Sequence, residues 1–174
     1  MKCIAISGLS GSGKTSLINE LALMLPNVKV LSFDDYDFDQ QINNYYELLL
    51  DSMDYNLLDL TALKNDILSN TNYDFILLDY PFSYKQKMIS PYISLSVYLD
   101  TPFDVALSRR LLRDHQDNDQ LLIALHQYLN HSRKIFVNYH HDMMLDCDII
   151  LDGQKDSEAL AYELIEIIHK SLVI

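Results

Sequence analysis

The chain has 174 residues, a hydrophobic content of 49% and a formal net charge of −12, from 13 basic and 25 acidic side chains. A chain of this size and composition can close one substantial core without disulfides, so we expect a single domain over residues 1–174. The negative charge argues against non-specific binding to nucleic acid or to an anionic membrane.

The cysteines and the first residues indicate a cytoplasmic protein. Cys3 and Cys147 are the only cysteines, which are too few for a disulfide framework and lack the spacing of a zinc site. The opening MKCIAISGL lacks the apolar region and cleavage site of a signal peptide. No segment has the roughly 18 uninterrupted apolar residues that a membrane helix needs. We therefore expect a cytoplasmic chain that does not enter the membrane.

Short apolar runs alternate along the chain with stretches of helical periodicity. This alternation predicts an α/β fold, a three-layer sandwich with a five-stranded parallel sheet flanked by helices. The expected strands are residues 2–7, 28–33, 75–79, 95–99 and 148–151. The expected helices are residues 14–25, 57–69, 103–114, 119–143 and 157–172.

The first motif, GLSGSGKTSL, lies between the first expected strand and the first expected helix. It fits the pattern G-x-x-x-x-G-K-[ST], in which small residues let backbone N–H groups surround phosphate oxygens at a helix N-terminus. Lys14 would reach the β- and γ-phosphates, and Thr15 would bind Mg²⁺. The alternative is a flexible turn that matches by chance. The residues expected to bind the nucleotide are Gly8, Ser10, Gly11, Ser12, Gly13, Lys14, Thr15 and Ser16.

Two further segments, LSFDDYDFD and FILLDYPFS, place carboxylates directly after expected strands. Carboxyl ends of parallel strands form the ligand-binding edge of such a sheet. Asp34 or Asp35 could accept a proton from an attacking hydroxyl or hold magnesium through water, or both could belong to a solvated acidic loop. Asp79 has the Walker B arrangement and would orient magnesium, or it caps the turn before Pro81.

The segment TPFDVALSRRLLRD places three arginines near the end of an expected helix. Arg110 and Arg113 are three residues apart, so they share a helix face and could hold one phosphoryl group during its transfer. Arg109 could contact the nucleotide or pack its stem against the helix. The alternative is that all three complement the helix dipole. Their concentration in so acidic a chain favours a local anion site.

Taken in this order, the four segments resemble the uridine kinase and nicotinamide riboside kinase group of P-loop phosphotransferases. YLDTPFDVALSRRLLRD is similar to the family's lid-entry segment, and CDIILDGQKDSEALAYELI is similar to its closing strand and helix. The resemblance covers most of the chain. It implies ATP and Mg²⁺ as cofactors, a nucleoside-kinase-like fold and a short lid around residues 109–120.

The resemblance also implies roles for single residues. Asp34 would be the general base that deprotonates a ribose 5′-hydroxyl, while Lys14, Arg110 and Arg113 would stabilise the transferring phosphoryl group. Magnesium would lie between Thr15, Asp34 and Asp79. The acceptor would contact Asp34, Asp35, Tyr36, Asn56 and Tyr80, with Tyr36 stacking on a ring unless it belongs to the core.

Three features of the sequence depart from the family's pattern. Asp79 and Tyr80 replace a Glu-Gly pair, the lid sequence HQDNDQ is short and lacks a further basic residue, and Asn56 falls where the family has an Asp that holds the ribose hydroxyls. The resemblance thus implies a kinase for a small hydroxyl acceptor, in first place a nucleoside. The alternatives are a nucleoside monophosphate or other small-metabolite kinase, and a nucleotide-binding regulatory protein without acceptor turnover.

Overall fold

A five-stranded parallel sheet forms the centre of the computed structural model, which describes residues 1–36, 54–115 and 117–171. The strand order is β2-β3-β1-β4-β5. The strands are β1 (Lys2–Gly8), β2 (Val28–Ser32), β3 (Phe75–Asp79), β4 (Leu95–Asp100) and β5 (Ile149–Asp152). All five predicted strands are confirmed, each within one residue at either end.

The central strand β1 pairs with β3 on one side and with β4 on the other. Every residue from Cys3 to Gly8 is buried. Burial on both faces explains why its sequence is a continuous apolar run instead of an alternating pattern. Because all the strands are parallel, their carboxyl ends meet at one edge of the sheet, where a ligand site is expected.

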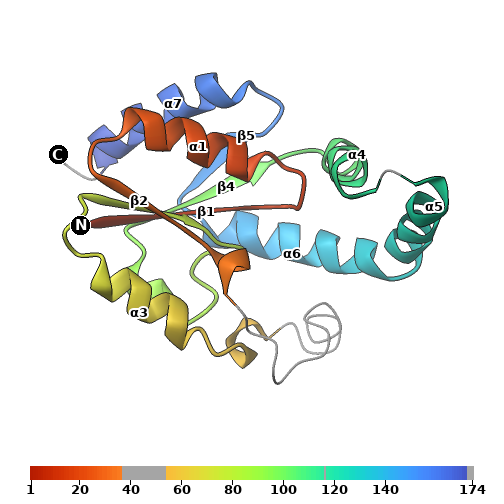
Figure 1. Ribbon diagram of the computed structural model, residues 1–174, viewed down its shortest axis with the longest axis horizontal. Helices are drawn as coiled ribbons and strands as arrows, with labels where there is room; N and C mark the ends of the chain where they lie inside the picture. Colours follow the sequence, from red (N-terminus) through yellow and green to blue (C-terminus); the bar gives the residue numbers. More distant parts are fainter. Residues whose placement is uncertain (37–53, 116, 172–174) are drawn as a thin grey trace.

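Helices cover both faces of the sheet, which confirms the three-layer α/β sandwich (Figure 1). On one face, α1 (Lys14–Met24) and α7 (Ser157–Ser171) pack together and bury Leu21 and Leu164 in the same cluster. On the other face, α3 (Thr61–Ser69) and α6 (Arg133–Asp146) contribute Ile67 and Met143 to a second cluster. The helices α4 (Phe103–Asp114) and α5 (Asn118–Gln127) extend beyond the edge of the sheet.

The prediction of a single long helix over residues 119–143 is wrong in one respect. The helical backbone runs from Asn118 to Asp146, but a π-helical turn at Tyr128–Ser132 separates α5 from α6. A π turn widens the helix by one residue and disturbs its hydrogen-bond ladder, so it is a natural place for a change of direction. Figure 1 shows that the chain turns sharply between these two helices.

The helix predicted at 57–69 begins later, at Thr61. Residues Tyr55–Leu57 form a separate 3₁₀ turn. The carboxylate of Asp59 accepts hydrogen bonds from the backbone N–H of Thr61, at 3.0 Å, and from its hydroxyl. These bonds satisfy donors at the start of the helix, so they favour a new helix start at this point.

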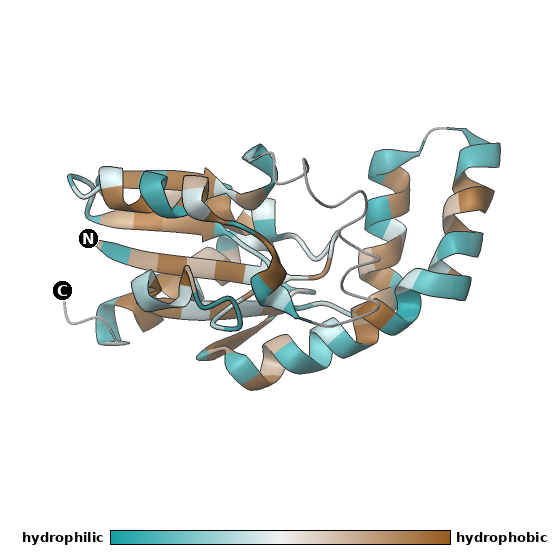
Figure 2. Ribbon diagram, turned by 90° about the horizontal axis from the view of Figure 1, so that it is seen from below, coloured by the Kyte–Doolittle hydropathy of each residue, from teal (hydrophilic) through white to brown (hydrophobic). Residues whose placement is uncertain are grey.

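Hydrophobic residues are concentrated on the strands, while the outer helices carry many hydrophilic ones (Figure 2). Within the described part of the chain, no helix combines the length and the apolar character needed to cross a membrane.

Candidate active site

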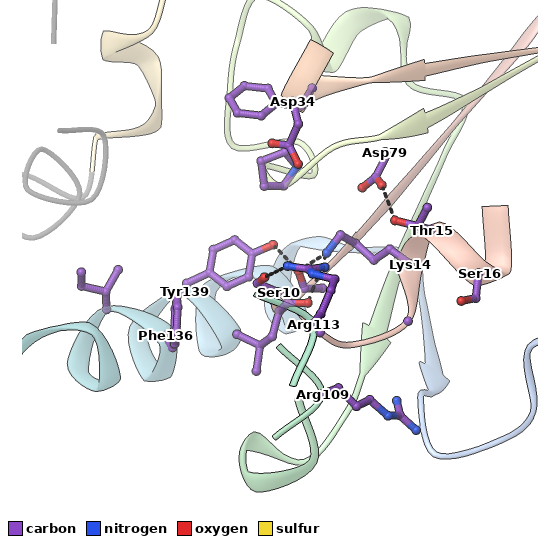
Figure 3. A pocket seen from close by; sticks show the side chains of 17 residues that line it. Ser10, Lys14, Thr15, Ser16, Asp34, Asp79, Arg109, Arg113, Phe136 and Tyr139 are labelled. Atoms are coloured by element: carbon purple, nitrogen blue, oxygen red, sulfur yellow. Dashed lines mark hydrogen bonds between the residues drawn. The ribbon is translucent and has the colours of Figure 1, made fainter. Parts of the chain in front are cut away.

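A cavity of about 630 Å³ opens at the carboxyl ends of β1, β2 and β3 (Figure 3). Residues of the GLSGSGKTSL loop form one end of it, and residues of α6 form a wall that adjoins the loop. The lining residues are Gly8, Leu9, Ser10, Gly11, Gly13, Lys14, Thr15, Ser16, Phe33, Asp34, Asp79, Pro81, Arg109, Arg113, Ile135, Phe136 and Tyr139. The cavity therefore brings together motifs that are far apart in the sequence.

The loop between β1 and α1 depends on its glycines. Gly11 and Gly13 have φ angles of 87° and 103°, in the left-handed region that favours glycine. A Cβ atom at Gly11 would also collide with the carbonyl oxygen of Ala106 in α4. Of the residues predicted to bind the nucleotide here, only Ser12 does not line the cavity, since it is buried beneath the loop.

Lys14 lies inside the loop and donates hydrogen bonds to the carbonyl oxygens of Gly8, at 3.0 Å, and Leu9, at 3.2 Å. Burial lowers the pKa of the Lys14 ammonium group, and attraction to the carboxylates of Asp79 and Asp34 opposes that shift. The ammonium group is thus poorly solvated and has negative charge nearby. A phosphate group in the cavity would supply the anionic partner that a buried ammonium needs.

The acidic residues lie on the other side of the loop. The Thr15 hydroxyl donates a 3.4 Å hydrogen bond to Oδ2 of Asp79 at the end of β3. Burial raises the pKa of the Asp79 carboxyl, and the Lys14 ammonium opposes that rise. Asp34 follows β2 and faces the same cavity (Figure 3). Asp35 is not among the lining residues.

The oxygen atoms of Thr15, Asp34 and Asp79 form a donor set that suits magnesium. Mg²⁺ is usually held by one or two carboxylates together with substrate phosphates, rather than by a closed cage of protein ligands. The residues present therefore fit magnesium bound together with a nucleotide.

The arginines of α4 are divided between two places. Arg113 lines the cavity, where its Nη2 lies 3.5 Å from Ser10 Oγ, and it also forms an ion pair with Asp114 at 2.7 Å. Arg109 lines the outer part of the cavity and donates a 3.4 Å hydrogen bond to the Gly153 carbonyl oxygen. Arg110 points elsewhere, with its guanidinium 5.3 Å from the centre of the Phe136 ring.

The pairing of Arg110 with Arg113 stays a prediction, and the structure directs these two side chains to different places. The two arginines that line the cavity are Arg109 and Arg113, which are four residues apart. Both spacings place side chains near one another on a helix, so the sequence alone did not separate them. The packing of α4 determines which arginines face the cavity. The turn from Ala106 to Arg110 lies against Gly11, and the Arg110 side chain is directed toward α6.

Other residues predicted to contact the acceptor lie outside this cavity. Tyr36 donates a 2.7 Å hydrogen bond to Asp66 of α3. Tyr80 is fully buried in the core, with its ring 5.2 Å from that of Phe82. The Asn56 side chain donates to Asp54, at 3.0 Å, and accepts a 2.8 Å hydrogen bond from the Lys87 backbone N–H.

The sequence analysis missed the apolar wall beside the phosphate loop. Ile135, Phe136 and Tyr139 come from α6, and Phe33 and Pro81 come from the ends of β2 and β3. The Tyr139 hydroxyl donates a 3.5 Å hydrogen bond to the Gly8 carbonyl oxygen. The i, i+4 spacing of Ile135 and Tyr139 predicts a buried helix face, but it does not say that this face borders a ligand cavity.

Sequence comparison relates the chain to kinases. The model of the phosphoribulokinase / uridine kinase family matches residues 80–159. The uridine kinase of Borrelia turicatae (strain 91E135) is 28% identical over 189 residues, which cover 92% of this chain and 91% of that protein.

Solved structures show the same fold. A shikimate kinase from Acinetobacter baumannii in complex with shikimate superimposes with a TM-score of 0.57 at 15% identity, covering 98% of this chain and 94% of the other. A deoxyadenosine kinase from M. mycoides gives a TM-score of 0.56 at 17% identity, covering 97% and 99%. The resemblance predicted from the motifs is confirmed, because the family model and the similarity to uridine kinases both support a uridine kinase-like P-loop kinase group. The solved structures add that the fold is shared.

Proposed function

We propose that the chain transfers the γ-phosphoryl group of ATP to a hydroxyl group of a small acceptor, in first place the ribose 5′-hydroxyl of a nucleoside. The observation that carries the proposal is the cavity in which Lys14, Asp34 and Arg113 face one another from three separate elements. The similarity to uridine kinases supports the choice of acceptor.

The phosphate end of the cavity supplies positive charge. Backbone N–H groups of the loop would hold the β- and γ-phosphates, and Lys14 would exchange its hydrogen bonds to two carbonyl oxygens for bonds to phosphate oxygens. Arg113 already faces the cavity near Ser10. In phosphoryl transfer, catalysis comes mostly from positioning and from charge stabilisation, and both groups provide these.

Thr15 and Asp79, with Asp34 across the cavity, would hold the magnesium ion that accompanies ATP. When bound, this ion neutralises charge on the phosphate oxygens. The contact between Thr15 and Asp79 fixes two of these oxygen groups in advance. Preorganised groups lose little conformational freedom when the ligand arrives.

At the acceptor end, we propose Asp34 as the general base. Its carboxylate would take the proton from the acceptor hydroxyl while that oxygen forms a bond to the γ-phosphorus, and the bond from phosphorus to the bridging oxygen of ADP breaks. The rings of Phe33 and Phe136 offer apolar surface against which a flat acceptor can pack.

We also propose that residues 1–174 act as one kinase domain with a short lid around residues 109–120. This range contains the end of α4 and the start of α5, where the two helices extend beyond the sheet. Because Arg109 and Arg113 lie in this range and line the cavity, movement of the lid would carry both arginines relative to the phosphate loop.

The test measures release of ADP from ATP and Mg²⁺ in the presence of uridine, cytidine, nicotinamide riboside, nucleoside monophosphates, vitamins and sugars. Acceptor-dependent ADP release with a nucleoside supports the proposal in full. Release with a monophosphate or a sugar only would keep the kinase and change its acceptor. Tight ATP binding without turnover of any acceptor would instead indicate a nucleotide-binding regulatory protein.

A further inference from the structure

We infer that Arg110 is a positioning residue, which fixes the Phe136 wall of the cavity against the phosphate loop, and not a group that holds the transferring phosphoryl. This inference rests on the proposed function, because the wall and the loop border one active site. It assigns different tasks to Arg110 and Arg113, although they stand only one helical turn apart.

The contact between Arg110 and Phe136 joins α4 to α6. The guanidinium carbon lies 5.3 Å from the ring centre, within the range of a cation–π contact. The ring of Tyr128, from the π turn before α6, lies 6.0 Å from that of Phe136. Phe136 is thus held by neighbours from two elements, and it also lines the cavity.

The same turn of α4 also contacts the phosphate loop. A Cβ atom at Gly11 would collide with the carbonyl oxygen of Ala106 and come within 3.1 Å of the backbone nitrogen of Arg110. Leu9 and Ser10 of the loop border a small hollow together with Arg110 and Phe136. Loop, α4 and α6 therefore meet at Arg110, whose backbone lies against Gly11 and whose side chain contacts Phe136.

This geometry makes a kinetic prediction. Since Phe136 lines the cavity wall and bears no charge, loosening it weakens the binding of ground state and transition state alike. Such a change raises KM and leaves kcat nearly constant. Removing a cation that acts only on the transferring phosphoryl lowers kcat and kcat/KM together.

The experiment measures Arg110→Met, Phe136→Leu and the variant that combines these two substitutions, and it compares all three with Arg113→Met. The substrates are ATP and the fastest acceptor among uridine, cytidine and nicotinamide riboside. We expect Arg110→Met and Phe136→Leu each to raise the acceptor KM about fivefold with kcat within about twofold, and the double variant to be no worse than either. Arg113→Met should lower kcat by about 10².

A loss of about 10² in kcat for Arg110→Met, with Phe136→Leu unchanged and additive effects in the double variant, would overturn the inference. Thermal melts of each variant show whether it is folded. Calorimetric titration with ATP separates this question from the proposed function. If the wild type releases no ADP with any acceptor, the proposed function fails. In that case the coupling is tested by the ATP affinity of Arg110→Met, Phe136→Leu and their double variant. Losses of affinity that are not additive support the coupling, and additive losses overturn it.

Discussion

The two ends of the cavity are built in different ways. The phosphate end comes from one continuous stretch of chain, residues 8–16, and it is lined by backbone groups, small residues and the Lys14 ammonium. The wall beside it is apolar and aromatic, and its side chains come from three elements: Phe33 after β2, Pro81 after β3, and Ile135, Phe136 and Tyr139 on α6.

This difference separates chemistry from selectivity. Any nucleoside triphosphate presents the same phosphates, so a short motif with fixed backbone geometry is sufficient to bind them. An acceptor is recognised by its shape and by its few polar groups, and a wall assembled from separate elements can change in one element without disturbing the loop. Substitutions at the phosphate end should therefore act mainly on kcat, and substitutions in the wall mainly on KM.

Lys14→Ala should have the largest effect. It removes a partly buried cation whose interaction with phosphate strengthens as charge develops in the transition state. We expect kcat to fall by about 10³ or more, measured as acceptor-dependent ADP release, with the protein still folded in thermal melts. Turnover that remained near the wild-type rate would show that this loop does not hold the transferred phosphate.

Asp34→Asn comes next, with Asp35→Asn as its matched control. Asp34 lines the cavity and Asp35 does not. Loss of a positioned general base lowers kcat by about 10², while ATP affinity measured by calorimetry in EDTA should change little. A large loss in Asp35→Asn together with a normal rate in Asp34→Asn would assign the base to the neighbouring carboxylate.

Asp79→Asn should affect activity and stability in opposite directions. Burial raises the pKa of this carboxyl, although Lys14 and Thr15 oppose the rise, so ionised Asp79 costs more free energy in the folded chain than in the unfolded one. The amide avoids that cost, so the melting temperature measured without nucleotide and in EDTA should rise by a few degrees. We expect kcat to fall about tenfold or more at low Mg²⁺, since one oxygen ligand is lost. A lower melting temperature would contradict the assigned cost of burial.

A smaller effect is expected in the wall, from Tyr139→Leu. The substitution removes the ring and the hydroxyl that donates to the Gly8 carbonyl oxygen. The acceptor KM should rise about fivefold with kcat within about threefold. Tyr139→Phe keeps the ring and serves as the control, with a change of about twofold or less. A drop confined to kcat in Tyr139→Leu would contradict the expectation that substitutions in the wall act mainly on KM.

The smallest effect should come from Asn56→Asp, which tests the role that the family resemblance assigns to this position. Asn56 is tied to Asp54 and to the Lys87 backbone and does not line the cavity. We therefore expect KM for uridine, cytidine and nicotinamide riboside to stay within about twofold of the wild type. A clear gain in kcat/KM for any of them would instead support contact between this position and the ribose.

Features that local sequence determines, such as the phosphate loop, could be predicted, whereas the wall that several elements build together could not. Both the five strands and the phosphate loop are visible in the sequence because local apolar runs and glycines determine them. The choice between Arg109 and Arg110 depends on how α4 packs against Gly11, a contact between residues about 100 positions apart. The participation of Phe136 and Tyr139 depends on where α6 crosses the sheet, and periodicity predicts only that such residues are buried.

The π turn at Tyr128–Ser132 has a consequence for length variation in this chain. A π turn holds one residue more than an α turn. Deleting one residue from it would convert the turn to ordinary α-helix and leave α5 and α6 facing nearly the same directions, because the wide turn takes up the extra residue within one turn. The chain can therefore gain or lose one residue at this turn while Phe136 and Tyr139 on α6 keep their places in the cavity wall.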